Sequence, residues 1–174
     1  MGARRDTPGG AEGDPGGVVE VVRSSVVRAP RERVWARVVT ADGVAHEFGP
    51  VLTMRFPSAL AGTSIAEVPT GRPVGRAWIL LAGVIPLEFD DLTILEDSAS
   101  RYFHERSRLG SCRVWEHRRD LEALPDGTTR VTDTLRAVPR ALLPRSVVRA
   151  VVGALFTHRH RRLARWADTT SGTR

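Results

Sequence analysis

The sequence predicts an α+β domain of the helix-grip type, in which a curved antiparallel sheet of about seven strands wraps one long C-terminal helix. Three observations support this prediction. Residues 139–166 carry apolar side chains at three- and four-residue intervals, the spacing of one broad face of an α-helix. Residues 51–137 instead contain short β-branched and apolar runs separated by glycine-containing turns, which is typical of strands. A strand and two short helical stretches precede them.

The N-terminal part of the chain predicts a tail, a strand and two short helices. Residues 1–17 are rich in Gly and Pro and contain no apolar run, so we expect a disordered tail that is neither a signal peptide nor a membrane span. The paired valines of Val18–Arg28 favour a strand. Pro30 suits the start of a first short helix, which a turn at residues 41–43 ends, and Val44–Phe48 forms a second one.

Further strands are expected between Val51 and Ala137, joined as an antiparallel meander. In the last hairpin, His117 and Arg119 share one strand face and Asp133 lies on one face of the next strand. If both are inner faces, Asp133 lies opposite His117 or Arg119, across an even-numbered loop of more than two residues, and so finds the partner that a buried charge needs. The expected spans are Val51–Phe56, Thr63–Val68, Val74–Leu81, Leu87–Glu96, Arg101–Arg108, Arg113–Glu122 and Thr128–Ala137.

The C-terminal helix is expected to run without interruption from Pro144 to Trp166, because proline is favoured in a first helical turn, and residues 139–143 lead into it. Its first half is apolar nearly all round, so it must lie on a large hydrophobic surface, for which the preceding strands are the candidate. Its second half is strongly basic. We expect one domain over residues 18–167 and a disordered tail at residues 168–174.

Composition is that of an ordinary globular domain large enough to bury a core. All 26 basic residues are Arg and the formal net charge is +6, which raises nucleic acid or an anionic membrane as partners. GC-rich coding explains the Arg bias more simply, so nucleic acid is not favoured. The single cysteine, Cys112, excludes an internal disulfide and favours a reducing compartment, so we expect a cytoplasmic bacterial protein.

Several motifs resemble the START-like, or SRPBCC, ligand-binding superfamily. In the segment from Ser25 to Trp35, a strand ends in Ala-Pro and Val-Trp follows on the first helix. The resemblance covers residues 20–166 and implies one helix-grip domain. The superfamily contains lipid carriers, aromatase/cyclases, hormone binders and stress proteins, so it implies a fold more than a single function. Segments similar to the bacterial polyketide cyclase/dehydrase-like branch are Gly83–Leu87, Val114–His117, Gly127–Asp133 and Leu155–Leu163.

A helix-grip fold leaves a cavity, because the concave face of the sheet is wider than one helix can fill. An apolar wall with a few polar groups suits a hydrophobic small molecule, such as a lipid or a polycyclic polyketide compound, with no cofactor. Alternatively, the polar side chains form a structural network that fixes strand register. The side chains expected at the cavity are Trp78, Leu80, Phe103, Glu105, Trp115, His117, Arg119, Asp133 and Phe156.

Three functions stay open, as does the oligomeric state. The favoured one is noncatalytic binding of a hydrophobic ligand, for transport or sequestration. The second is a polyketide cyclase/dehydrase-like enzyme, in which His117 is the acid/base and Asp133 orients it. That branch often has a second His where this chain has Arg119, so the chain lacks the second histidine that a catalytic His pair would need. The third is contact with a polyanion or an anionic membrane through the basic helix end.

The Arg and His residues of the basic helix end can each be explained without a polyanion or a metal ion. Cations complement the dipole at a helix C-terminus, so a solvated end accounts for the run of Arg residues from Arg159 to Arg165. Arg159 alone is placed to face inward, one turn beyond Phe156. His158 and His160 lie about 200° apart around a helix, so a single metal ion cannot bind both, and no metal site is expected.

Overall fold

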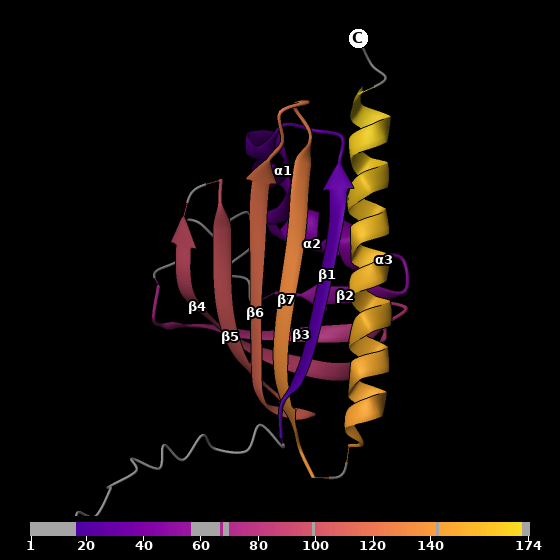
Figure 1. The fold of residues 1–174 in the computed structure, drawn as a ribbon. Coiled ribbons are helices and arrows are strands. Elements are labelled where there is room, and N and C mark those ends of the chain that lie inside the picture. The colour runs from indigo at the N-terminus through magenta and orange to yellow at the C-terminus, as the bar shows by residue number, and fades with distance from the viewer. Residues whose placement is uncertain (1–16, 57–66, 68–69, 99, 142, 172–174) are drawn as a thin grey trace, which may run out of the picture.

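A computed structural model describes residues 17–56, 67, 70–98, 100–141 and 143–171 (Figure 1). It confirms the predicted α+β helix-grip architecture, with two short helices after the first strand and a long helix at the end. The elements are β1 (Val19–Val27), α1 (Arg31–Val38), α2 (Ala41–Phe48), β2 (Leu52–Arg55), β3 (Pro73–Leu81), β4 (Ile85–Ser98), β5 (Tyr102–Leu109), β6 (Cys112–Ala123), β7 (Thr129–Pro139) and α3 (Arg145–Ser171).

The seven strands form one antiparallel sheet in the order β1-β7-β6-β5-β4-β3-β2. The chain therefore begins at one edge, crosses to the other through α1 and α2, and returns strand by strand to place β7 beside β1. Figure 1 shows the sheet curling so that β2 and β3 cross behind the other strands, while α3 runs along β1. The predicted strand Thr63–Val68 lies outside the described residues, apart from Glu67.

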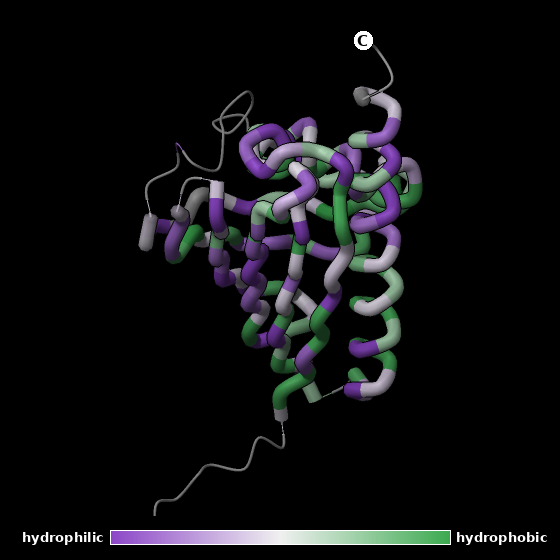
Figure 2. Tube along the Cα trace, turned by 45° about the horizontal axis from the view of Figure 1, so that its top comes forward, coloured by the Kyte–Doolittle hydropathy of each residue, from purple (hydrophilic) through white to green (hydrophobic). Residues whose placement is uncertain are grey.

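The register of the last hairpin decides which residue faces Asp133. Arg119 pairs with Asp133, and His117 pairs with Leu135. Hydrophobic and hydrophilic residues follow one another along the strands of the sheet (Figure 2). Along β7 and residues 117–121 of β6 the buried residues are the odd-numbered ones, as predicted. Five residues, Leu124–Thr128, join the last pair, so the expected even-numbered loop is wrong. Two odd-numbered residues can face each other only across an odd number of loop residues.

The break between the two short helices falls earlier than predicted. Residues 41–43, expected as a turn, form the first turn of α2. Thr40 causes this, because its Oγ1 accepts a hydrogen bond from the backbone N–H of Gly43 (3.1 Å) and so caps the helix. The result is a second helix of eight residues that buries Glu47 and Phe48 near its end.

Helix α3 begins after Pro144, as predicted, but it ends at Ser171 rather than near Trp166. Residues 168–171 are therefore helical and not part of a tail. Neighbouring side chains hold this last turn: Arg33 Nη2 donates to the carbonyl oxygen of Thr170 (3.2 Å), and Arg28 lies 3.6 Å from the Asp168 carboxylate. At the other end, β7 extends to Pro139, and the helix begins at Arg145.

The buried interior has two apolar clusters with charged residues between them. Along β7, Val131 belongs to one cluster and Leu135 to the other, and Asp133 separates them. On α3 the clusters follow in the reverse order, and Arg159 and His160 lie between them. The fold therefore places a layer of charge across the middle of its core.

Candidate functional site

The buried charged layer consists of Glu47, His117, Arg119, Asp133, Arg159 and His160, and Arg119 is its centre. Arg119 is fully buried and binds two carboxylates at once. Its Nε and Nη2 donate to Asp133 (2.7 and 2.8 Å), while Nη1 and Nη2 donate to Glu47 (2.7 and 3.0 Å). Arg159 Nε donates to the same Glu47 carboxylate (2.9 Å). Helices α2 and α3 are thus joined to the sheet through paired charges.

His117 lies between two carboxylates on the inner face of β6. Its Nδ1 is 2.9 Å from Glu105 Oε1 on β5, and its Nε2 is 2.8 Å from Asp133 Oδ1 on β7. Burial alone would lower the pKa of His117, but the hydrogen bonds to Asp133 and Glu105 outweigh it and raise the pKa. When both carboxylates are ionised, both ring nitrogens act as donors and the ring is an imidazolium.

His160 continues these hydrogen bonds from Asp133 to β1. Its Nε2 lies 2.8 Å from Asp133 Oδ2, and its Nδ1 lies 2.6 Å from Ser25 Oγ. Together with His117 this makes an unbroken chain of hydrogen-bonding groups from Glu105 to the half-buried Ser25. The two histidines therefore bind the same aspartate, one at each of its carboxylate oxygens.

The charged layer is stable because its charges cancel. Burial would raise the pKa of Asp133, but the Arg119 guanidinium and the hydrogen bonds from both histidines hold it well below its usual range. Arg119 and Arg159 likewise overcome burial and lower the pKa of Glu47. The two carboxylates of Asp133 and Glu47 thus bind the two guanidiniums of Arg119 and Arg159. Buried ion pairs persist only when charges and lone pairs are matched in this way.

A cavity of about 340 Å³ lies beside this layer, enclosed by the inner face of the sheet, by α2 and β2, and by α3. Its volume falls within the usual range of ligand pockets. The polar residues at its wall are Glu88, Asp90, Glu105, Ser111, His117 and Arg159. The apolar ones are Val44, Phe48, Leu52, Met54, Phe56, Ile79, Leu87, Leu92, Phe103, Leu109, Cys112, Trp115, Leu143, Val147, Val148, Val151, Val152, Leu155 and Phe156.

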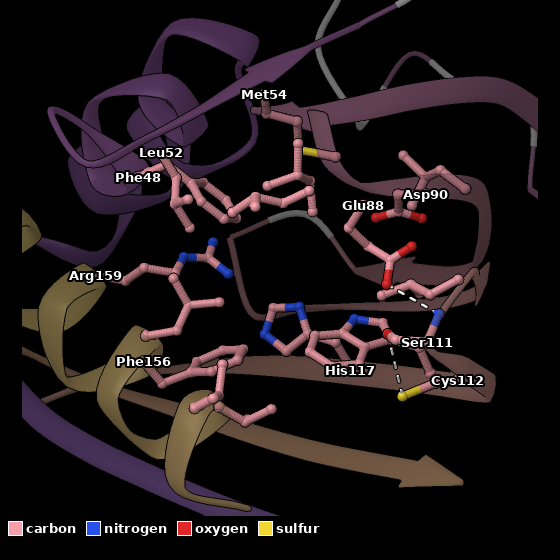
Figure 3. Close-up of a pocket in the computed structure, with 18 of the residues that line it drawn as sticks. Phe48, Leu52, Met54, Glu88, Asp90, Ser111, Cys112, His117, Phe156 and Arg159 are labelled. Atoms are coloured by element: carbon pink, nitrogen blue, oxygen red, sulfur yellow. Dashed lines mark hydrogen bonds between the residues drawn. The ribbon is translucent and has the colours of Figure 1, made fainter. Parts of the chain in front are cut away.

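The two ends of the cavity carry opposite charge. Arg159, bound to Glu47, is on one side, and Glu88 and Asp90 are on the other, with His117 between them (Figure 3). Glu88 is held by three backbone N–H groups, those of residues 89, 110 and 111, at 2.9, 2.7 and 3.0 Å. Asp90 is 6% exposed, and its Oδ1 accepts no hydrogen bond from the described residues.

The structure brings five of the nine predicted site residues to the cavity wall, namely Phe103, Glu105, Trp115, His117 and Phe156. Arg119 and Asp133 lie behind that wall in the charged layer, where they contact other protein groups.

Trp78 and Leu80 are outside the cavity lining, which corrects the prediction for these two residues. Trp78 is 44% exposed on the opposite sheet face, and Ile79 points inward instead, opposite Glu88. Trp78, Ile79 and Leu80 are all apolar, so alternation along these three residues could not assign the inner face.

Several residues of the site were missed from the sequence. Glu47 carried one usable signal: an acid among the apolar residues of a short helix must find a partner once buried. His160 was considered only as a metal ligand. Glu88, Asp90 and Leu92 occupy every second position of β4 and therefore share one strand face. Nothing in the sequence marks that face as the inner one.

Two absences hold for the described residues. No group of three or more His, Cys, Asp and Glu side chains there is arranged to hold a metal ion. Within the same part of the chain, no helix combines the length and the apolar character needed to cross a membrane.

The basic end of α3 is divided between the interior and the surface. Arg159 is buried against Glu47, and Arg162 donates from Nε to the carbonyl oxygen of His46 (3.1 Å). Arg161 and Arg165 are exposed. The inward position predicted for Arg159 is confirmed, because its guanidinium carbon lies 4.9 Å from the centre of the Phe48 ring.

Comparisons with known proteins give one family and many similar folds. A family model described as Domain of unknown function (DUF8410) matches residues 25–167. A search of curated proteins returns no match.

Among solved structures, the Zhui aromatase/cyclase from a Streptomyces species is similar with a TM-score of 0.65 and 16% identity, over 90% of this chain and 97% of that one. A START superfamily protein from Mycobacterium smegmatis has a TM-score of 0.63 and 11% identity, over 87% of this chain and 98% of that one. DynU16, a putative protein in the dynemicin biosynthetic locus, has a TM-score of 0.59 and 22% identity, over 90% of this chain and 49% of that one. The START-like fold predicted from the sequence is therefore confirmed.

Proposed function

The chain belongs to the family described as Domain of unknown function (DUF8410), and from its fold and cavity we propose that it binds a hydrophobic small molecule between the sheet and α3. The ligand class is a lipid or a polycyclic, polyketide-like compound, held for transport or sequestration. The observation that carries this proposal is the unfilled, largely apolar cavity of about 340 Å³. Protein interiors normally pack like organic crystals, so an apolar space of this size is one that a bound molecule would fill.

The rim of the cavity supports the same proposal. Three apolar side chains of its wall stay in contact with water: Leu87 is 55% exposed, Val147 48% and Val151 61%. A ligand that enters beside them removes apolar surface from water, which favours binding by roughly 25 cal/mol per Å² buried. The volume lies near the lower end of the range for ligand pockets, so a compact ring system fits better than a long extended acyl chain.

Native mass spectrometry of the freshly purified protein beside its denatured mass tests the proposal first. Titration with fatty acids, isoprenoids and polycyclic aromatics then follows the fluorescence of Trp115, which lies in the cavity wall. We expect a discrete extra mass or saturable one-to-one quenching by compact polycyclic compounds. An empty protein that ignores the whole panel would contradict the proposal.

A matched pair of variants shows whether the ligand occupies this cavity. Val151→Trp narrows the mouth, and Val22→Trp makes the same change at an exposed valine of β1 outside the cavity lining. We expect calorimetry to show at least about tenfold weaker binding for Val151→Trp, a loss of about 1.4 kcal/mol, and an unchanged affinity for Val22→Trp. Equal affinities would place the ligand elsewhere.

A second candidate function is acid–base catalysis of the cyclase/dehydrase type, which the arrangement of Glu105 and His117 favours. Both nitrogens of His117 already bind carboxylates, and Asp133 does not reach the cavity, so these two cannot act on a ligand directly as a pair. Glu105 lines the cavity and can exchange a proton with His117 behind it. If turnover exists, Glu105→Gln abolishes it and leaves ligand binding intact, whereas a noncatalytic binder shows no turnover to lose.

Contact with a polyanion or an anionic membrane through the basic helix end has less support. Two of the arginines considered for it, Arg159 and Arg162, bind other parts of the chain, and this leaves Arg161 and Arg165 exposed. Two cations give only a shallow dependence of binding on salt. Binding to anionic vesicles that falls steeply between low and moderate salt would revive this alternative.

A further inference from the structure

Asp90 differs from the other acids of the cavity region because no described residue donates a hydrogen bond to its Oδ1. Glu47 and Asp133 bind guanidinium and imidazole groups, and Glu88 binds three backbone N–H groups. Asp90 is also buried, at 6% exposure, and its Oδ1 accepts no hydrogen bond from the described part of the chain. Buried acceptors without partners are rare because they lose their hydrogen bonds to water and gain no hydrogen bond within the protein.

The surroundings of Asp90 do not compensate its charge either. Glu105 faces it from β5, and Glu88 and Asp91 neighbour it on β4, so the closest titratable groups are acids. Ser107 on β5 is the donor nearest to Asp90 and lowers its pKa, but no hydrogen bond of normal length and angle joins the two groups among the described residues. The guanidinium of the cavity wall, Arg159, lies on the other side and is bound to Glu47 (Figure 3). Asp90 belongs to the cavity wall, so a bound molecule can approach its carboxylate there.

We propose that Asp90 anchors the ligand by accepting a hydrogen bond from an O–H or N–H group of an otherwise apolar molecule. This inference rests on the proposed ligand-binding function and adds the ligand's polar chemistry to it. A phenol, an alcohol or an amine supplies the missing donor, while its apolar body contacts the leucine and valine side chains of the wall. A carboxylate or phosphate does not fit at this end, because it meets Glu88 and Glu105.

The protonation state of Asp90 determines how strongly a ligand with each type of donor group binds. Burial, and then the negative charge of Glu105, raise the pKa of Asp90 to about 7. Near neutral pH both forms are populated, and the ionised form is the stronger acceptor because charge-assisted hydrogen bonds are stronger than neutral ones. An ammonium group gains most from that ionisation, whereas a neutral hydroxyl binds to both forms.

Four naphthalene derivatives of similar size separate these chemistries: a naphthol, its methyl ether, a naphthylmethylammonium ion and a naphthoate. We expect the naphthol to bind about tenfold to a hundredfold more tightly than the methyl ether, which has no donor. The naphthoate should bind most weakly. If the ammonium ion gains affinity between about pH 6 and pH 8 more than the naphthol does, the natural donor is cationic; the reverse order points to a hydroxyl.

Three variants assign the preference to Asp90. Asp90→Leu should abolish the advantage of the naphthol over the methyl ether. Asp90→Asn should keep part of that advantage but lose any gain in ammonium affinity with rising pH. Asp91→Asn is the control, because Asp91 is the next residue of β4, with its carboxylate bound to Arg76 outside the cavity lining. Should Asp90→Leu not fold, the isosteric Asp90→Asn and the pH profile of the wild-type protein decide the question.

The possible failures are distinguishable. Equal affinity of the wild-type protein for the naphthol and its methyl ether overturns the role of Asp90 and leaves ligand binding in the cavity intact. Binding of none of the four compounds, together with an empty protein in native mass spectrometry, overturns the proposed function and this inference with it. A naphthol preference that survives in Asp90→Leu assigns the donor contact to another residue.

Discussion

Asp133 and Asp90 are the same chemical group in two opposite environments. Both lie on the inner face of a strand, and both are almost fully buried, at 1% and 6% exposure. Asp133 receives hydrogen bonds from Arg119, His117 and His160, and these hold its pKa well below the usual range. Asp90 lacks a donor for Oδ1, and its pKa rises to about 7.

The difference shows how this fold uses buried charge for two purposes. Asp133 connects β6, β7 and α3, so its charge contributes to the architecture that forms the cavity. Asp90 makes no ion pair with the described residues, and its raised pKa means that its ionised form costs stability near neutral pH. Proteins keep such unfavourable groups where function requires them. The contrast leads to four predictions, which distinguish residues that stabilise the fold from Asp90, which we propose binds a ligand.

The largest effect is expected from removing the centre of the charged layer. Arg119→Leu leaves the carboxylates of Asp133 and Glu47 buried without their main partner, so we expect a loss of about 3–5 kcal/mol in the free energy of unfolding. Urea denaturation measures it. Arg118→Ala is the control, because Arg118 pairs with Asp120 at the half-exposed outer face and should contribute less than about 1 kcal/mol. A loss of stability in Arg119→Leu as small as the one in Arg118→Ala would show that the charged layer does not stabilise the fold.

The next effect is a pH dependence of opposite sign at the two aspartates. In the unfolded chain an Asp carboxyl titrates near pH 4, and folding raises the pKa of Asp90 to about 7. Between these values the unfolded state loses its proton first, so the wild-type protein loses stability relative to Asp90→Asn by up to about 1.4 kcal/mol per pH unit as pH rises. The difference is constant above this window and absent below it.

Asp133 supplies the control for that experiment. Its pKa is lowered by folding, so its contribution is complete above about pH 4 and is lost as pH falls below that value. Asp133→Asn should therefore be destabilising at neutral pH, where Asp90→Asn is stabilising. Chemical denaturation from below about pH 4 up to about pH 8 measures both effects. Two variants with the same sign at neutral pH would contradict the contrast between the two environments.

A smaller effect is expected where the charged layer meets the cavity. Folding raises the pKa of His117, so the stabilisation from its charge is complete below about pH 6.5 and is lost as pH rises through the folded value. Glu105→Gln removes one of the two carboxylates that cause the shift and should cost about 1.5–3 kcal/mol below pH 6.5. Titration of the His117 ring by NMR should show a lower pKa in this variant, and an unchanged pKa would contradict the assignment. Glu116→Gln, which affects the outer His104 instead, is the control.

The contrast between these regions also explains what the sequence alone could reveal. The Arg119–Asp133 pair was one of two predicted alternatives, because strand alternation places both on inner faces and a buried charge needs a partner. The long helix followed from its apolar spacing, although the hydrogen bonds that extend it to Ser171 come from side chains outside that pattern.

The rest of the site depends on contacts between distant parts of the chain. Glu47 reaches Arg119 across 72 positions and Arg159 across 112, and no local pattern encodes such a meeting. The inner face of β3 was assigned wrongly because Trp78, Ile79 and Leu80 are all apolar. Asp90 was missed for a related reason: its importance lies in having no partner for Oδ1, which only the packed structure reveals.

The smallest effect is expected at the helix that carries Glu47. Thr40→Ala removes the side-chain cap of α2 and should cost about 1 kcal/mol, the usual value for an N-cap threonine. The cap is a neutral group at the opposite end of the helix from Glu47, so the loss should be the same at pH 5 and pH 8, as measured by urea denaturation. Thr169→Ala is the control, because its hydroxyl bonds only within the last turn of α3. A loss at Thr40 that changes with pH would show that α2 moves with the charged layer, and the separation between architecture and ligand site would then be incomplete.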